Sequence, residues 1–269
     1  NLPPLALTIF SSVKALSQYK ASELVEMGVD LVWVGYEGQQ SGYEKQVGRS
    51  YPEIFEDFRA HGTSVLASAI IGSDYQNEEI ARREFEDLMA LKPALEQFLI
   101  YGPPHGTPLY DRLKAEGRLN MAAMHKPHMQ DGFRQLFEHE HFGAAQIEAL
   151  QKELFRKAFD RLGPSAFRIV RNWFIGHRHL KDHAQPRVRD KAQRYGADAH
   201  ESLPVLAGSR RFAPAASQGW LAQLERDIID ALGPMDKEQQ RIARIVPAMF
   251  QLTRLRTARR LRPQPNPPR

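Results

Sequence analysis

The sequence predicts an α/β fold, a set of parallel βα units followed by a mainly helical region. Short apolar runs that end in Gly or Pro recur along the first part of the chain, with connections long enough to hold a helix. This is the spacing of parallel strands joined by crossover helices. The runs are apolar almost throughout, as expected for strands covered on both faces. Four such units fit part of a (β/α) barrel or an open doubly wound sheet.

The four predicted strands are rich in branched and aromatic apolar residues. They are LALTIF (Leu5–Phe10), DLVWVGYE (Asp30–Glu37), SVLASAIIG (Ser64–Gly72) and QFLIYGPP (Gln97–Pro104). Two of the helices between them carry clear boundary signals. Gly62 ends the helix Tyr51–Gly62, and Asn77 caps the helix Asn77–Leu91.

The chain beyond Gly117 is predicted to be mainly helical. Helical patterns cover Gln146–Gly163, a helix that begins at Pro164, Ala192–Leu203, Gly219–Gly233 and Asp236–Leu261. A Pro/Gly/Ser-rich segment before the last two patterns is predicted to be a linker. The predicted organisation is a partial barrel at 1–118, a helical domain at 119–203, a linker at 204–218, and C-terminal helices with an Arg-rich tail at 219–269. The last residues of that tail are expected to be disordered.

Composition excludes several kinds of site. The 269 residues include no cysteine, so the chain forms no disulfide, thiolate metal site or thiol nucleophile of its own. No apolar run approaches the roughly 18 residues of a membrane span. The N-terminus lacks the pattern of a signal peptide, so a cytoplasmic location is expected. The first residue is Asn rather than Met, so the sequence is expected to be a fragment or a processed product.

The net charge of +5 is concentrated near the C-terminus. Residues 241–269 hold eight Arg and no acid, which leaves about −3 for the other residues (5 − 8). A specific nucleic-acid partner is therefore not expected. Apolar residues alternate with these arginines, and three interpretations stay open: a basic amphipathic segment on anionic lipid, a non-specific nucleic-acid contact, or a packed helix with a solvated Arg face. The first would make the protein membrane-peripheral and favour a lipid-like substrate.

Ligand-binding groups are expected at the carboxyl ends of the strands, because the loops of parallel βα folds converge there. Those ends are GYEG, IIGS and YGPPHGTPLY, and their glycines allow a ligand to approach the backbone. Glu37, at the end of the second strand, is placed to accept hydrogen bonds from ligand hydroxyls, as acidic residues do with ribose. Alternatively, Glu37 caps the next helix or pairs with an Arg.

Three motifs in this region resemble a known family. GVDLVWVGYEG, SVLASAIIG and YGPPHGTPLYDRLKAEGRL match, in order and spacing, the "GxD-apolar-GxES", "GI-apolar-IxG" and "PxPGTPLY…EGRL" elements of the second half of a radical S-adenosylmethionine barrel. The stretch from Phe137 to Leu180 is similar to the region that follows the barrel in proteins that pair it with a cobalamin-binding domain. The resemblance covers about residues 1–200.

The resemblance implies roles for particular residues. Such barrels have six βα units, and the four strands here match the third to the sixth. The matching cofactor-binding positions are Gly35, Glu37, Ile70, Ile71, Gly72, Tyr101 and Gly102. Glu37 matches the residue that contacts the ribose of S-adenosylmethionine. Ile70 to Gly72 match the strand against adenine, and Tyr101 and Gly102 match the last strand, whose backbone borders adenine.

The chain departs from the family pattern in two ways. The CxxxCxxC motif that binds the 4Fe–4S cluster is absent, and in the family it lies on the first strand, which would precede Asn1. The cobalamin domain would lie earlier still. The cluster and cobalamin are therefore expected to be held outside this chain, and the chain alone is expected to be inactive. The family's GxES also reads GYEG, with Gly38 in place of a small hydroxyl residue.

The activity implied by the resemblance is radical methyl transfer to an unactivated carbon of a small-molecule or lipid-like substrate. Ring rearrangement and oxidation also occur in this class. One alternative is a radical barrel without cobalamin, similar to the methylthiotransferases, which usually carry a small β-rich RNA-binding domain after the barrel. Another is a non-catalytic βα module that binds a nucleotide or a membrane.

Histidine clusters offer a further hypothesis, a metal site. The candidates are His125 with His128, His139 with His141, and His177 with His179 and His183. Only His179 and His183 stand four residues apart, and no zincin motif accompanies them. Ordinary surface and loop histidines are the favoured interpretation.

Overall fold

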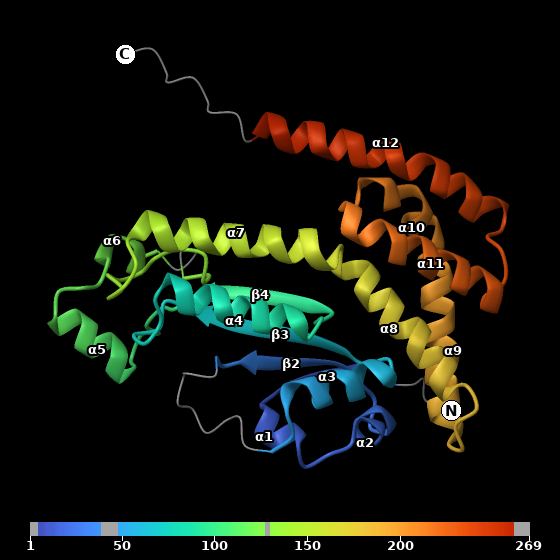
Figure 1. Cartoon of the computed structure of the whole chain (residues 1–269), viewed down its shortest axis with the longest axis horizontal. Coiled ribbons are helices and arrows are strands. Elements are labelled where there is room, and N and C mark those ends of the chain that lie inside the picture. Colours follow the sequence, from blue (N-terminus) through green and yellow to red (C-terminus); the bar gives the residue numbers. More distant parts are fainter. Residues whose placement is uncertain (1–4, 39–47, 127–129, 261–269) are drawn as a thin grey trace.

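A computed structural model describes residues 5–38, 48–126 and 130–260 of the chain. The sheet has four parallel strands, β1 (Leu7–Ser11), β2 (Val29–Tyr36), β3 (Ser64–Ile71) and β4 (Leu95–Ile100), which lie side by side in sequence order (Figure 1). All four predicted strands are confirmed, with ends that differ by a few residues. The order of the described strands does not reverse. A reversal of strand order is what creates the switch point of a doubly wound sheet.

The connections between the strands are helical, as predicted. They contain α1 (Val13–Leu16), α2 (Ala21–Glu26), α3 (Tyr51–Ala60) and α4 (Glu78–Ala90). A capping box of Ser50 and Glu53 begins α3, and the Asn77 side chain accepts a 2.9 Å hydrogen bond from the Ile80 amide at the start of α4. These caps satisfy amides that would otherwise lack partners, and they set where each helix begins.

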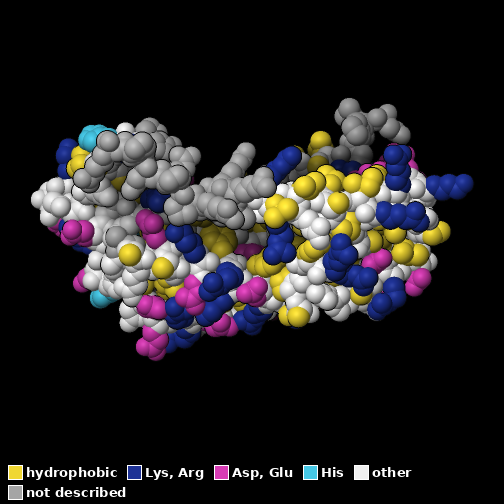
Figure 2. All heavy atoms as spheres, turned by 90° about the horizontal axis from the view of Figure 1, so that it is seen from above, with side chains coloured by type: hydrophobic (Ala, Val, Ile, Leu, Met, Phe, Trp, Pro, Cys, Tyr) yellow, Lys and Arg dark blue, Asp and Glu magenta, His cyan; other side chains and the backbone are white. Residues whose placement is uncertain are grey.

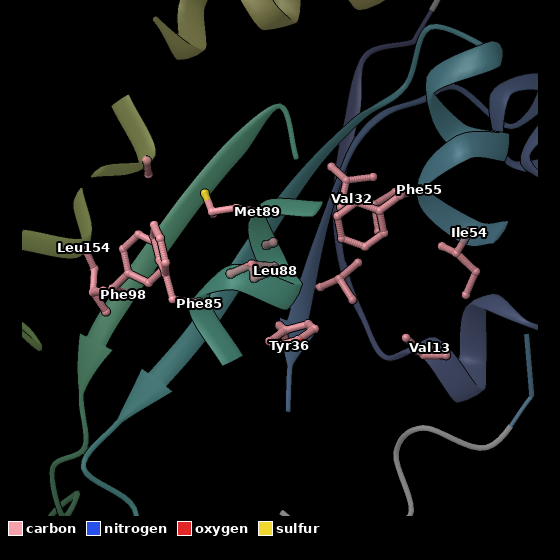
Figure 3. Packing of buried hydrophobic residues seen from close by; sticks show 14 of the residues in the cluster. Val13, Val32, Tyr36, Ile54, Phe55, Phe85, Leu88, Met89, Phe98 and Leu154 are labelled. Atoms are coloured by element: carbon pink, nitrogen blue, oxygen red, sulfur yellow. The ribbon is translucent and has the colours of Figure 1, made fainter. Parts of the chain in front are cut away.

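One face of the sheet carries the main hydrophobic core. Alternate residues of the strands, among them Val32, Tyr36 and Phe98, pack against helices on that side (Figure 3). The helices contribute Ile54 and Phe55 of α3, Phe85, Leu88 and Met89 of α4, and Leu154 of α7 (Ala144–Leu162). The Phe98 ring lies 5.6 Å from Phe85 and 5.0 Å from Phe155 of α7, so α4 and α7 meet over β4.

The opposite face is not part of any described core. Register pairs Phe10 with Trp33 and Trp33 with Leu66, and the ring of Phe10 stacks on Trp33 at 4.6 Å. Phe10 is nevertheless 73% exposed and Ile70 is 42% exposed. The expectation that both faces are covered is therefore wrong for this face, within the part of the chain that the structure describes. We call it the open face.

The region after the sheet is mainly helical, as predicted. Two short helices precede α7 in the chain, α5 (Pro108–Ala115) and α6 (Met121–Met124). After α7 come α8 (Ser165–Leu180), α9 (Pro186–Glu201), α10 (Leu203–Ser209), a 3-10 turn (Arg210–Phe212), α11 (Ala215–Leu232) and α12 (Lys237–Arg260). Residues 261–269, where the disordered end is expected, lie outside the described residues.

The predicted linker at 204–218 is wrong. Most of this segment is helical, in α10, the 3-10 turn and the start of α11. Pro204 lies in the first turn of α10, where a missing amide costs no hydrogen bond. Leu203 and Leu206 are fully buried in a core that α8, α9 and α11 also form. Burial therefore outweighs the turn-like composition of the segment.

Helices α8 and α9 are attached to the amino ends of the strands. Lys191 of α9, 2% exposed, donates to the Val29 carbonyl at 2.9 Å and lies 2.5 Å from Asp30 Oδ1. Tyr195 donates to the same Asp30 oxygen at 2.8 Å. The guanidinium of Arg168 lies 2.6 Å from Glu96 at the start of β4. The carboxyl ends of the strands, where a ligand is expected, are left free of these helices (Figure 1).

Candidate functional site

Glu37 lies at the carboxyl end of β2 with its side chain toward the open face. Its Oε1 is 3.3 Å from the position that a Cβ on Gly35 would occupy, and Gly35 belongs to the open face because it pairs with Ser68. The Tyr51 hydroxyl fixes this end of the strand, since it accepts from the Glu37 amide at 3.2 Å and donates to the Gly35 carbonyl at 3.0 Å. Burial raises the pKa of Tyr51 above its ordinary value.

Glu37 does not cap α3, which is the next helix among the described residues. Helix α3 begins at Tyr51, and its N-cap is Ser50, whose hydroxyl accepts from the Glu53 amide. The start of α3 is therefore capped without the Glu37 carboxylate. It remains at the edge where the loops converge, next to a glycine that leaves room on the open face.

A polar row crosses the open face below Glu37. Gly35, Ser68 and Gln97 are register partners on β2, β3 and β4, and the Ser68 hydroxyl donates to Gln97 Oε1 at 3.1 Å. Ile70 and Leu99 form the next row toward the carboxyl ends. The open face therefore offers a carboxylate and an exposed isoleucine side by side, above hydroxyl and amide groups.

Ile70, Ile71 and Gly72, to which the resemblance gives the role of bordering adenine, differ in which groups they expose on the open face. Ile70 exposes its side chain on the open face, whereas Ile71 is 3% exposed and packs in the helix-covered core. Gly72 has a φ of +91°, and a Cβ there would lie 2.7 Å from the ring of His139. Ile71 and Gly72 can therefore contact a ligand on the open face only through their backbone.

Tyr101 and Gly102 continue β4 beyond the sheet. The Tyr101 amide donates to the Ile71 carbonyl at 2.8 Å, and its ring meets Phe137 edge-on at 6.0 Å. A Cβ on Gly102 would lie 3.1 Å from Leu136. Leu136 and Phe137 therefore pack against this pair of residues. The structure brings Glu37 and Ile70 to one face and places Tyr101 and Gly102 at the neighbouring strand end.

A polar network lies beside Glu37, and the sequence patterns did not predict it. Gln76, 2% exposed, donates from Nε2 to Glu84 at 2.5 Å, and its Oε1 accepts from the Gly72 and Ser73 amides at 2.8 and 3.1 Å. The Tyr75 hydroxyl lies 3.3 Å from the other Glu84 oxygen. Burial raises the pKa of the Glu84 carboxyl above its ordinary value.

Gly38 is the residue near this network that departs from the family pattern in the sequence. A Cβ on Gly38 would lie 1.5 Å from Glu84 Oε1. A serine at this position, as in the GxES pattern, would occupy the space that the Glu84 carboxylate fills. Gly38 and the half-buried Glu84 carboxylate therefore belong together.

Two cavities border the site. One, of about 500 Å³, is lined by Tyr36, Glu37 and Tyr51 together with residues of α4. The other, of about 700 Å³, is lined by Gln135 and His139 among others. His139 Nδ1 lies 2.7 Å from the Gly72 carbonyl and so carries the donated proton, while its buried Nε2 and the Gln135 Oε1 have no partner among the described residues. Burial lowers the pKa of His139, which favours the neutral ring.

The described residues contain no cluster of three or more His, Asp or Glu arranged to hold a metal ion. His177 Nδ1 instead lies 2.9 Å from the Ala192 carbonyl, and the His179 ring meets His61 edge-on at 4.8 Å. His128 lies outside the described residues. An iron–sulfur cluster does not fit this chain's own side chains, because the sequence has no cysteine to supply thiolate.

Comparison with known proteins adds no family assignment. No protein-family model matches the chain, and no curated protein matches it at a significant level.

Proposed function

We propose that this chain is the adenosine-binding part of a radical S-adenosylmethionine enzyme of the cobalamin-associated class, whose parent reaction is methyl transfer to an unactivated carbon. The observation that carries the proposal is the position of Glu37. Its carboxylate lies at the carboxyl end of a parallel strand, on the open face, beside the exposed Ile70. Carboxylates in this position of βα folds accept hydrogen bonds from ribose hydroxyls.

The two unlike faces of the sheet favour a barrel over a doubly wound sheet. A doubly wound sheet is covered by helices on both faces, whereas the inner face of a barrel is enclosed by its own strands. Here one face is covered and the strands follow in sequence order. A four-stranded part of a six-unit barrel accounts for both facts.

The residues of the open face suit S-adenosylmethionine. Glu37 binds the ribose hydroxyls, Ile70 gives adenine an apolar surface, and the backbone at Gly72 and Tyr101 borders the base. When bound, S-adenosylmethionine supplies the radical and methyl chemistry. The chain's own residues bind and orient it, and since the chain has no cysteine we assign no electron-transfer step to it.

The helical region after the sheet favours the cobalamin-associated class. Methylthiotransferase-like enzymes would carry a small β-rich domain there. From residue 101 to the end of the described chain, the only strand pairing is one isolated bridge between Leu119 and Phe137, and the rest of the regular structure is helical.

Titration calorimetry of the chain with S-adenosylmethionine tests the proposal. Glu37→Gln removes the negative charge but keeps the size of the side chain, and we expect affinity to fall about tenfold or more, as for a hydrogen bond to a charged group. Glu79→Gln, an exposed carboxylate in the first turn of α4, is the matched control and should bind as the wild type does.

Two results would contradict the proposal. One is no binding of S-adenosylmethionine by the wild type, and the other is equal affinity of the wild type and Glu37→Gln. Binding of unrelated nucleotides as tightly as S-adenosylmethionine would instead support the alternative of a non-catalytic nucleotide-binding module.

A further inference from the structure

Helix α12 packs on the rest of the molecule along one side. A Cβ on Gly208 of α10 would lie 2.6 Å from the Ala243 carbonyl oxygen, so the two helix backbones nearly touch. Val246 is 5% exposed, and the Phe250 ring stacks on Phe212 with centroids 5.6 Å apart. Ala243, Val246 and Phe250 recur at helical spacing, and they define the packed side of α12.

A second stripe of α12 is apolar but faces solvent. It consists of Ile242, Ile245, Met249 and Leu252, whose spacing of three and four residues places them on one side of the helix. Their exposures are 42%, 47%, 59% and 56%, and Leu255 follows at 61%. We call these five residues the apolar stripe. Contiguous exposed apolar surface of this kind marks interaction sites on soluble proteins.

Arginines flank the apolar stripe. Arg241, Arg244, Arg254 and Arg256 lie on the same helix, and none of them forms an ion pair with another residue that the structure describes. The sequence from residue 241 to its end has no acid at all. Seen from the side on which α12 lies, hydrophobic atoms are interspersed with Lys and Arg (Figure 2).

We propose that α12 binds the surface of an anionic lipid bilayer. The apolar stripe would enter the boundary between headgroups and acyl chains, and the long Arg side chains would reach the lipid phosphates. None of the described helices is long and apolar enough to cross a membrane, so the contact is with the surface. This inference goes beyond the proposed function and does not depend on it.

The positive charge and the exposed apolar surface of α12 together favour lipid over a second copy of the chain or a nucleic acid. A second copy of the chain would bring the same arginines against those of α12, with no acid from residue 241 onward to neutralise them. A nucleic acid would neutralise the arginines but leave the apolar stripe in water. An anionic bilayer satisfies both, since each Arg near such a surface gains electrostatic attraction and each apolar side chain leaves water. Of the interpretations left open by the sequence, packing of the helix holds for one side of α12, and for its exposed side we infer a lipid contact rather than a nucleic-acid contact.

Co-sedimentation of the full chain with vesicles tests the proposal. We expect binding to phosphatidylcholine vesicles that contain about one quarter phosphatidylglycerol, and little binding to pure phosphatidylcholine. Binding should weaken as salt rises from about 0.1 M to about 0.5 M, because the Debye length shortens.

Variants of exposed residues separate the two contributions. Ile245→Ser with Met249→Ser should abolish binding, and Arg241→Gln and Arg244→Gln should each lower the partition coefficient about fivefold. Phe159→Ser on α7, where the side chain is 44% exposed, and Arg226→Gln on α11 remove the same kinds of group elsewhere. Both controls should bind as the wild type does, and circular dichroism should show unchanged helix content in all variants.

Three outcomes would overturn the proposal. The first is equal binding to neutral and anionic vesicles, and the second is anionic binding that survives loss of Ile245 and Met249. The third is no vesicle binding together with a dimer that the same two substitutions convert to a monomer, which would assign the apolar stripe to a second copy of the chain.

Discussion

At Gly38, a carboxylate that is far away in the sequence leaves no room for a side chain. The space beside it is filled by Glu84, which Gln76 holds at 2.5 Å. Motif comparison identified Gly38 as a departure from a pattern but gave no reason for it. The reason depends on how α4 lies against the end of β2, which local sequence patterns do not specify.

We expect Gly38→Ala to lower the free energy of unfolding by about 1–2 kcal/mol, because the new methyl group displaces the Glu84 carboxylate from its part-buried hydrogen bond with Gln76. In a Glu84→Ala background the same substitution should cost less than about 0.5 kcal/mol, since the clash is gone. Urea denaturation of the four proteins measures this coupling. Strictly additive effects would show that Glu84 does not fill this space.

His139 should make stability depend on pH. Burial lowers the pKa of the folded-state ring below its ordinary value. Above about pH 6.5 both folded and unfolded states are neutral and the ring contributes nothing. As pH falls below that value the unfolded state takes up a proton that the folded state does not, so stability is lost until the folded-state pKa is reached.

Thermal unfolding at about pH 7.5 and about pH 5.5 tests this prediction. His139→Asn keeps a donor toward the Gly72 carbonyl but does not titrate, so its loss of Tm on acidification should be smaller than that of the wild type. An equal loss in both proteins would mean that other groups cause the acid sensitivity.

At the scale of elements, glycines report how closely helices approach. Gly208 and Gly219 both lie within helices, α10 and α11. A Cβ on Gly208 would meet the Ala243 carbonyl at 2.6 Å, whereas one on Gly219 would meet nothing within 4 Å. The sequence presents both as glycines near Pro and Ser, which is why the segment that contains Gly208 was predicted to be a linker.

Gly208→Ala should destabilise the protein by about 1–3 kcal/mol, because backbone atoms of α12 must move. Gly219→Ala should stabilise it by up to about 1 kcal/mol through helix propensity alone. Chemical denaturation of both variants checks the contrast. Stabilisation by Gly208→Ala would contradict the close packing of α10 on α12.

The attachment of α9 to the sheet rests on Asp30. Asp30→Ala would leave Lys191, 2% exposed, as a buried charge without its carboxylate. We expect a loss of about 3–5 kcal/mol, and recovery of most of it in the double variant Asp30→Ala with Lys191→Met. Glu56→Ala, at a carboxylate that is 79% exposed, is the control and should cost less than about 0.5 kcal/mol. A small effect of Asp30→Ala, in the same range as the control, would show that the cluster does not hold α9.

At the scale of the whole molecule, the fold class and the order of the elements were predictable because apolar runs, caps and glycines report local structure. The open face was not, although alternation offered a signal: Ser68 and Gln97 interrupt their strands at positions that face the same way. Part of the candidate site was also predictable, since Glu37 and Ile70 belong to motifs. Gln76, Glu84 and His139 join it only through packing between elements far apart in sequence.

The proposed function depends on ribose binding by Glu37 on the open face. The most direct test measures the affinities of adenosine and 2′-deoxyadenosine for the wild type and for Glu37→Gln. We expect the wild type to favour adenosine by about tenfold, as for a hydrogen bond to a charged group, and Glu37→Gln to lose most of this preference. The same preference in both proteins would contradict it, because the 2′-hydroxyl would then be bound by some other group.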